Sequence, residues 1–218
     1  MEYLIDSADV KLIKKIIEYY PIAGVTTNPS LISQMKKPIT EIVPEIRDCI
    51  GLERMLHVQI LNSEASKIVD DAIALNELAK GNFYAKIPVT MEGIKAMQQL
   101  KRMGIKVTST AIFTEQQALL SAKSGADYVA PYVNRLDNIS TDGTKVVQDI
   151  AKLLRCYDSL TKVLAASFKN VEQVHRVSMG GVSAVTLVPE LFEKLLYHPL
   201  TDIIIDNFLK DGENYYNL

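Results

Sequence analysis

One lysine lies in an apolar stretch of the sequence where a charged side chain is out of place. In the run FYAKIPV, residues 83–89, Lys86 is the only charged residue. Burial disfavours the charged form of an amine, and a neutral amine attacks carbonyl carbons to form a Schiff base. The alternative is a structural lysine, which pairs with Asp6 or extends to solvent from a strand end. The residues alone leave both interpretations open.

Polar side chains end other apolar runs in the same way. Besides Lys86, they are Asp6, Thr26 with Asn28, Gln59, Thr110, Tyr132 and Ser167. The C-terminal ends of parallel strands meet at one rim of a sheet or barrel, and active sites are built at that rim. We therefore expect these side chains to form one site.

Most of these residues also have a structural interpretation. Asp6 and Asn28 can bind adjacent hydroxyl groups of a substrate, with Thr26 beside them, but Asp and Asn also favour turns and helix N-caps. Tyr132 is a candidate acid or base, although inward tyrosines commonly pack with the hydroxyl hydrogen-bonded. Gln59 and Thr110 can hold a water molecule or form structural hydrogen bonds. Both interpretations remain open for each residue.

Ser167, Lys169 and Arg135 are candidates for binding a phosphate group. Ser167 and Lys169 stand at the expected start of a helix, where backbone N–H groups and the helix dipole attract anions. Arg135 follows Tyr132 by three residues and can add a bidentate contact. Its alternative is an exposed ion pair with Asp137. Together these residues predict a phosphorylated substrate.

Short β-prone runs alternate with helical patterns along the whole chain. The eight runs are Glu2–Asp6, Gly24–Asn28, Met55–Leu61, Phe83–Pro88, Ile105–Thr110, Tyr128–Val133, Lys162–Ser167 and Ala184–Val188. Such alternation favours parallel strands with right-handed crossovers, and eight strands can close into a (β/α)8 TIM barrel. The predicted class is therefore α/β, with an open doubly wound sheet as the competing fold.

The chain is predicted to form one domain over residues 1–218, because no linker or low-complexity segment divides it. Two helical stretches, Pro189–Tyr197 and about Pro199–Phe208, follow the last strand. One of them completes the eighth unit of a barrel. Residues from about 199 to 218 are then an extra C-terminal helical tail, which is free to cover a neighbour or the barrel end.

Residues typical of helix ends and of a barrel lumen follow the same repeat. We expect N-caps at Ser7, Asn62, Thr90, Thr114 and Asn170, with Gln173 completing a capping box at Asn170. We expect left-handed helix ends at Gly24, Gly81, Gly104, Gly125 and Gly181. If the polar strand residues point inward, side-chain alternation extends the lumen lining to Leu4, His57, Tyr84, Thr108, Ala130 and Ala165.

The composition excludes several classes of function. The chain has 218 residues, 48% hydrophobic and 23% charged, with a formal net charge of −2. This balance is typical of a globular protein and gives no electrostatic basis for a dedicated nucleic-acid binder. The sequence lacks a signal peptide and a long apolar span, so we expect a cytoplasmic protein that does not bind membranes.

Metal and cofactor sites lack their usual sequence patterns. Cys49 and Cys156 cannot build a disulfide framework or a cysteine-ligated metal site, and they fit a reducing compartment. His57, His175 and His198 have no metal-binding spacing. Dinucleotide, P-loop and serine-hydrolase motifs are also missing from the sequence. We therefore predict neither a metal nor a cofactor.

Four segments resemble the small transaldolase family, and within it most closely the fructose-6-phosphate aldolases. They are GVTTNPSLI (24–32), YAKIPVTMEGIKA (84–96), GADYVAPYVNRLD (125–137) and KVLAASFKN (162–170). The resemblance runs nearly from end to end. It implies a metal-free class I aldolase mechanism, with Lys86 as the Schiff-base lysine.

The resemblance also assigns roles to the other rim residues. Asp6 and Asn28 match family residues that hold hydroxyls of the dihydroxyacetone portion. Gln59, Thr110 and Tyr132 match those that position the catalytic water and handle protons, and Arg135, Ser167 and Lys169 match the phosphate-binding group. The implied partner is thus a small sugar phosphate.

Two positions indicate which reaction to expect. The resemblance implies Glu in place of Gln59 and Phe in place of Tyr132 for transaldolases, which also tend to have Asn in place of Thr108. This sequence therefore matches the aldolases that cleave fructose 6-phosphate to dihydroxyacetone and glyceraldehyde 3-phosphate. The alternatives are a transaldolase that transfers the dihydroxyacetone unit to erythrose 4-phosphate and a non-catalytic sugar-phosphate binder. The family also implies a homo-oligomer, a pentamer or a decamer.

Overall fold

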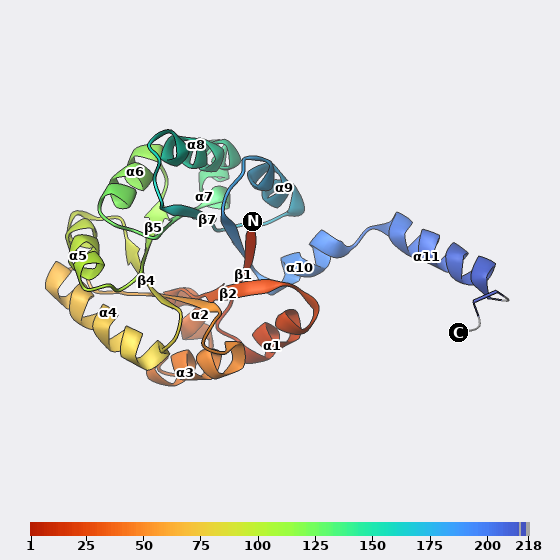
Figure 1. Cartoon of the computed structure of the whole chain (residues 1–218), viewed down its shortest axis with the longest axis horizontal. Coiled ribbons are helices and arrows are strands. Elements are labelled where there is room, and N and C mark those ends of the chain that lie inside the picture. The colour runs from red at the N-terminus through yellow and green to blue at the C-terminus, as the bar shows by residue number, and fades with distance from the viewer. Residues whose placement is uncertain (214, 217–218) are drawn as a thin grey trace.

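The computed structural model describes residues 1–213 and 215–216 and contains eight parallel strands closed into a barrel (Figure 1). The strands are β1 (Glu2–Asp6), β2 (Ile22–Thr26), β3 (Met55–Gln59), β4 (Phe83–Pro88), β5 (Val107–Ile112), β6 (Tyr128–Pro131), β7 (Lys162–Ala165) and β8 (Ala184–Leu187). Each strand pairs with the next, and β8 pairs with β1. The predicted α/β class and TIM barrel are confirmed, and the open sheet is wrong.

A ring of helices covers the outside of the barrel (Figure 1). The helices of the described residues are α1 (Val10–Tyr19), α2 (Pro29–Gln34), α3 (Ile39–Ile50), α4 (Ala65–Ala79), α5 (Met91–Arg102), α6 (Glu115–Lys123), α7 (Val133–Asp137), α8 (Gly143–Cys156), α9 (Val171–Met179), α10 (Pro189–Leu196) and α11 (Pro199–Gly212). The short helices α2 and α7 follow β2 and β6 closely, so the chain beyond these two strand ends is held in helical turns.

Side-chain alternation along the strands creates two separate cores. Outward residues such as Ile5 and Val58 are fully buried against the helices. The inward residues Leu4, Met55, Tyr84, Tyr128, Leu164 and Ala184 form a second cluster, which we call the lower lumen. The expected inward positions of Leu4 and Tyr84 are confirmed. The expected position of Ala165 is wrong, because Leu164 points inward on β7 and Ala165 packs against the helices.

Three of the five expected N-caps are confirmed. The side chains of Thr90, Thr114 and Asn170 each accept a hydrogen bond from a backbone N–H of the first helical turn. The expected capping box at Asn170 is incomplete, because the Gln173 side chain accepts from the Lys169 N–H instead of that of Asn170.

The expected N-caps Ser7 and Asn62 are wrong. Helix α1 is capped two residues later by Asp9, and the Ser7 hydroxyl accepts from the Asp9 N–H. Helix α4 follows Glu64, and the Asn62 amide donates to Asp71 instead. In both cases the chain needs two more extended residues between the strand end and the helix.

Four of the five glycines expected at helix ends are found there, and the fifth instead allows a close contact between two strands. Gly81, Gly104, Gly125 and Gly181 have positive φ just before a strand, as expected. Gly24 is a wrong assignment, because it lies inside β2. A Cβ at Gly24 would lie 2.4 Å from the Met55 carbonyl oxygen, so glycine is required there for the close approach of β2 to β3.

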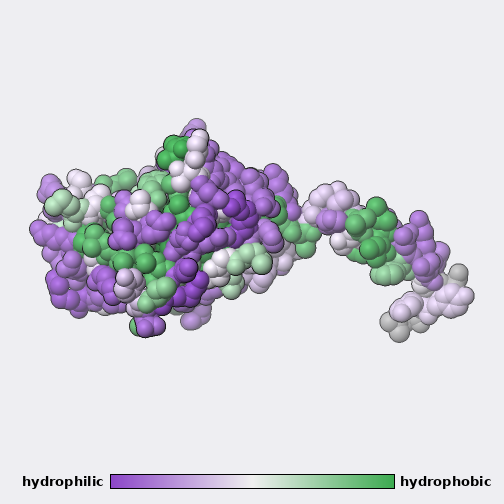
Figure 2. All heavy atoms as spheres, turned by 90° about the horizontal axis from the view of Figure 1, so that it is seen from above, coloured by the Kyte–Doolittle hydropathy of each residue, from purple (hydrophilic) through white to green (hydrophobic). Residues whose placement is uncertain are grey.

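The C-terminal helix extends away from the barrel. Helix α10 completes the eighth unit, and α11 projects from it as an arm with no buried residue (Figures 1 and 2). The predicted tail is therefore helical to Gly212, while residues 214 and 217–218 lie outside the described residues. Within the described chain, no helix has the length and apolar character needed to cross a membrane.

Candidate active site

The rim at the C-terminal ends of the strands contains a cavity of about 470 Å³. Eight of the predicted site residues line it: Asp6, Asn28, Gln59, Lys86, Tyr132, Arg135, Ser167 and Lys169. The other two lie directly behind this lining, where Thr26 bonds to Asp6 and Thr110 bonds to Tyr132. The structure therefore brings all ten residues into one region, contributed by seven strand ends.

Lys86 projects into the lumen from the middle of β4. It is in register with Gln59 on β3 and Thr108 on β5, and it is only 4% exposed. Its Nζ donates a hydrogen bond to the Thr27 carbonyl oxygen at 3.3 Å. The structural interpretation offered two arrangements: the ion pair with Asp6 is not formed among the described residues, and a side chain that is only 4% exposed does not extend to solvent. The amine is therefore buried at the cavity without a carboxylate partner.

Thr110 and Tyr132 form a hydroxyl pair on the wall made by β5 and β6. Their side-chain oxygens are 2.9 Å apart. Ala111, the next residue on β5, has φ of 58° and marks an irregularity in the pairing with β6. Thr110 lies directly before this irregular position, where β5 departs from regular pairing with β6. The pair can pass a proton between its two oxygens and a water molecule in the cavity.

Asp6 belongs to a hydrogen-bonded chain on the opposite wall. The Thr26 hydroxyl donates to Asp6 Oδ1 at 2.7 Å, and the same Thr26 oxygen is 2.7 Å from Thr186 Oγ1. Thr186 is 3% exposed and lines the cavity from β8. The prediction missed Thr186, although alternation from Ala184 along this strand would have placed it inward.

Asn28 combines the two roles that its sequence position left open. Its side-chain oxygen accepts a hydrogen bond from the Leu31 N–H at 3.1 Å and so caps α2. The same residue lines the cavity beside Pro29. Because the cap uses the carbonyl oxygen of the amide, its NH2 group remains available to a hydroxyl or carbonyl group in the cavity.

The three candidate phosphate residues also meet at the cavity. Ser167 has φ of 65°, and its carbonyl accepts from the Asn134 N–H, which ties the β7 end to α7. Arg135 lies over the Tyr132 ring at 5.3 Å and does not pair with Asp137. Asp137 instead accepts hydrogen bonds from the Gly143 N–H and the Gln173 side chain. Within the described part of the chain no carboxylate pairs with this guanidinium, so it can bind an anion.

A buried histidine lies below the cavity, in surroundings that the sequence did not reveal. His57 is fully buried, stacks on Tyr84 at 4.4 Å, and bonds to Thr108 Oγ1 through Nδ1 at 2.8 Å. Burial, followed by the positive charge of Lys86, lowers the pKa of His57 from 6.5 to about 3. Its Nε2 has no hydrogen-bond partner in the described structure. His57 is thus neutral at ordinary pH, with one polar atom unpaired.

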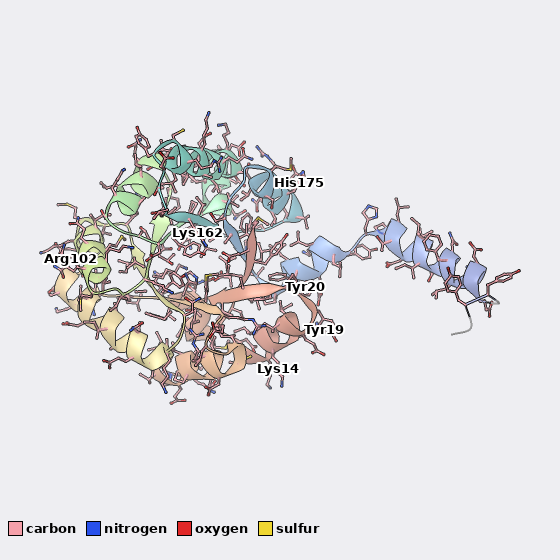
Figure 3. All side chains as sticks on the ribbon, viewed as in Figure 1. Lys14, Tyr19, Tyr20, Arg102, Lys162 and His175 are labelled. Atoms are coloured by element: carbon pink, nitrogen blue, oxygen red, sulfur yellow. The ribbon has the colours of Figure 1, made fainter. Side chains whose placement is uncertain are left out.

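The other two histidines lie elsewhere. His175 is on α9 in the outer ring of helices (Figure 3), and His198 caps α11 through a bond from the Leu200 N–H. The rim chemistry therefore rests on the lysine, the tyrosine, the carboxylate and the neutral hydroxyl and amide groups described above.

Comparison with known families agrees with this arrangement. The sequence model of the transaldolase/fructose-6-phosphate aldolase family matches residues 3–215, which is nearly the whole chain. Apart from Glu2 at the start of β1, the match covers all eight strands, and it includes every rim residue described above. The chain belongs to the transaldolase/fructose-6-phosphate aldolase family.

Proposed function

We propose that this protein is a class I aldolase that cleaves fructose 6-phosphate to dihydroxyacetone and glyceraldehyde 3-phosphate, and that it also catalyses the reverse addition. The single observation that carries the proposal is the position of Lys86, a buried amine that opens onto the cavity with only a carbonyl oxygen as partner. An amine in this position can attack a ketone, whereas an amine in an ion pair cannot do so readily.

The reaction would begin with attack of the Lys86 amine on C2 of the ketose. Loss of water from the resulting carbinolamine gives an iminium ion, which withdraws electrons from the adjacent carbons. Removal of the C4 hydroxyl proton then breaks the C3–C4 bond and releases glyceraldehyde 3-phosphate, while the bonding electrons form an enamine. Protonation at C3 and hydrolysis by water return dihydroxyacetone and the free amine.

The remaining rim residues supply binding and proton transfer in this scheme. Asp6 and Asn28, with Thr26 behind Asp6, would hold hydroxyl groups near the Schiff base. Gln59 and the Thr110–Tyr132 pair would hold the water that carries protons. Arg135, Ser167 and Lys169 would bind the phosphate through a charged guanidinium, a hydroxyl and a lysine side chain.

The choice of aldolase over transaldolase rests on the chemistry of Tyr132. A phenol that is hydrogen-bonded to Thr110 beside the amine can protonate the enamine through a bound water, so that dihydroxyacetone leaves. A transaldolase must instead keep the enamine until a sugar acceptor arrives. The neutral amide of Gln59 fits the same role, because it positions water without taking its proton.

The experiment that tests the proposal measures covalent capture and product together. Borohydride reduction with fructose 6-phosphate should attach a dihydroxyacetone unit to the peptide that contains Lys86. Dihydroxyacetone should be released without erythrose 4-phosphate, and Tyr132→Phe should lower that release about 100-fold while capture persists. Turnover that depends on the acceptor would favour the transaldolase alternative. Saturable binding without any covalent adduct would favour a sugar-phosphate binder.

The exposed arm supports a homo-oligomer as part of the proposal. Ile203, Ile204, Ile205, Phe208 and Leu209 on α11 are each about half exposed or more. Figure 2 shows hydrophobic residues, in green, on the segment that stands clear of the barrel. Burial of this surface on another copy of the chain, in a pentamer or decamer, would remove it from water. Deletion of residues 199–218 should then reduce the mass measured by light scattering to that of a monomer.

A further inference from the structure

The hydrogen bond between His57 and Thr108 passes beside the root of the Lys86 side chain. His57 is on β3, Thr108 is on β5, and β4 lies between them, so the 2.8 Å bond from Nδ1 to Oγ1 crosses the strand that carries Lys86. Thr108 is in register with Lys86, and neighbouring strands are about 4.8 Å apart. A buried hydroxyl therefore lies next to the lysine, and the proposed reaction gives it no task.

Two tyrosines hold the ring of His57 in this orientation. The imidazole stacks on Tyr84 with ring centroids 4.4 Å apart, and it lies edge-to-face with Tyr128 at 5.5 Å. The two tyrosine rings are themselves 5.4 Å apart, and the Tyr128 hydroxyl donates to Glu2 Oε2 at 3.1 Å. Because these rings pack together, His57 cannot turn away from Thr108 without opening the lower lumen.

Among the described residues, Lys86 makes no hydrogen bond to this neighbouring hydroxyl. Its Nζ donates to the Thr27 carbonyl oxygen at 3.3 Å. The N–H of Thr27 in turn donates to the His57 carbonyl oxygen at 2.9 Å. His57 thus binds, through its main chain, the residue that contacts the amine and, through its ring, the hydroxyl that does not.

The hydrogen bonds made by the amine affect which of its two forms is favoured. A bond from the ammonium ion to an acceptor favours the charged form, which does not attack a ketone. A threonine oxygen without another partner can accept such a bond from a neighbouring ammonium. The bond to His57 holds the Thr108 oxygen in one rotamer, in which it makes no bond to Nζ, because a change of rotamer would break that bond.

We propose that His57 is a positioning residue for Lys86, which holds the Thr108 hydroxyl away from the amine and so leaves the amine free to attack a ketone. This inference rests on the proposed Schiff-base function. Burial lowers the pKa of His57 to about 3, so the ring makes its bond to Thr108 without placing a charge beside the amine. An apolar ring of similar size could fill the same space but could not hold the hydroxyl.

The test measures how fast Lys86 forms a Schiff base with saturating dihydroxyacetone, by adding borohydride after increasing reaction times. His57→Phe keeps a ring against Tyr84 and frees the Thr108 hydroxyl, so the rate constant for adduct formation should fall about 10-fold. This rate constant does not depend on the fraction of folded protein. His57→Leu frees the same hydroxyl and provides a second reading if the phenylalanine variant is poorly folded.

Removal of the freed hydroxyl separates positioning from a general loss of structure. The double variant His57→Phe/Thr108→Val should regain the wild-type rate constant to within about 3-fold, and Thr108→Val alone should stay in the same range. A structural defect would instead make the double variant as slow as the single His57→Phe variant, or slower.

A matched control is Ser121→Ala, which removes a buried hydroxyl that bonds to Ser109 at 2.8 Å on the outer face of β5. This control should leave the rate constant unchanged. An unchanged rate constant in both His57 variants, or a slow double variant, would overturn the inference while capture by the wild type still upheld the proposed function. If the wild type forms no adduct with dihydroxyacetone or fructose 6-phosphate, the proposed function fails, and this inference fails with it.

Discussion

The two halves of the barrel lumen are built from the same strands but have opposite chemistry. The lower lumen contains Leu4, Tyr84, Tyr128 and Leu164, which are all buried and pack against one another. Two residues further along the same strands, the rim presents polar groups such as Asp6 and Lys86 to a cavity. Alternation along a strand thus fills the barrel with apolar and aromatic side chains at one end and presents polar groups to a cavity at the other.

Two hydrogen bonds between side chains form the boundary between these halves. Thr26 and Thr186 bond across β1, and His57 and Thr108 bond across β4. The bond across β1 ends at Asp6, whereas the bond across β4 passes beside Lys86 and leaves His57 Nε2 unpaired. The boundary therefore gives the carboxylate a fixed donor and gives the amine a neutral neighbour. This comparison leads to predictions that distinguish function above the boundary from stability below it.

The largest effect is expected from the amine itself. Lys86→Met keeps the length of the side chain but removes the nucleophile, so aldol turnover should fall about 10⁴-fold or more. Because the amine is buried with one hydrogen-bond partner, the same variant should also raise the free energy of unfolding by about 1–2 kcal/mol. Kinetic assays and urea titrations measure the two quantities. An active Lys86→Met variant, or one that is clearly less stable than the wild type, would contradict the assignment of function to the rim and stability to the lower lumen.

The reverse pattern is expected in the lower lumen. Leu164 is 1% exposed, and Leu164→Ala should lower the free energy of unfolding by about 2–4 kcal/mol through lost burial and a cavity. The folded fraction should retain kcat within about 2-fold at a temperature well below its melting point. Leu164→Met, which keeps the volume, serves as the control and should cost less than about 1.5 kcal/mol. A large loss of kcat with little loss of stability would remove the distinction between the halves.

His57 at the boundary should make stability depend on pH. Its pKa is lowered from 6.5 to about 3, so between these values the unfolded chain binds a proton that the folded protein does not. Stability is therefore complete above about pH 6.5 and falls as the pH decreases toward 3, with a loss of about 2 kcal/mol by pH 5.

The measurement compares urea unfolding at pH 7 and pH 5 for the wild type and for His57→Phe, which keeps an aromatic ring against Tyr84. The variant should lack this part of the acid sensitivity, whereas Asp and Glu titration contributes equally to both proteins. Equal pH dependence in the two proteins would show that His57 is not kept neutral by burial.

Much of the barrel and of its rim could be predicted from the sequence. Short β-prone runs, most of them largely apolar, mark every strand, because a strand buried on both faces is rich in apolar residues. A single charged or polar residue within such a run, as with Lys86, or at its end, as with Gln59, is then informative. The ends of the elements were less predictable. Gly24, Ser7 and Asn62 have the residue types of helix ends, but their roles depend on how far the chain runs before it turns.

The wall of Asp6 could not be predicted in full because it depends on closure of the barrel. Thr186 is separated from Thr26 by 160 positions, and no local pattern indicates that β8 and β2 flank the same strand. Similarly, the inward residue of β7 is Leu164 instead of Ala165, because the β7 strand ends before Ser167 and the alternation does not continue through that turn.

The smallest effect is expected from the cations that lie over tyrosine rings at the two ends of the lumen. Lys162 begins β7 and lies 5.7 Å from the Tyr128 ring centroid at the lower end (Figure 3), and Arg135 lies 5.3 Å from that of Tyr132 at the rim. Lys162 is exposed, so Lys162→Gln should change the free energy of unfolding by about 0.5 kcal/mol or less and leave activity unchanged. Arg135→Gln should change the free energy of unfolding as little but, under the proposed function, raise KM about 10-fold for phosphorylated substrates only, because Arg135 is the proposed phosphate-binding group at the rim. The measurement compares KM for glyceraldehyde 3-phosphate with KM for unphosphorylated glyceraldehyde in both variants. Equal KM values in the two variants would mean that Arg135, like Lys162, makes no contact with the phosphate group.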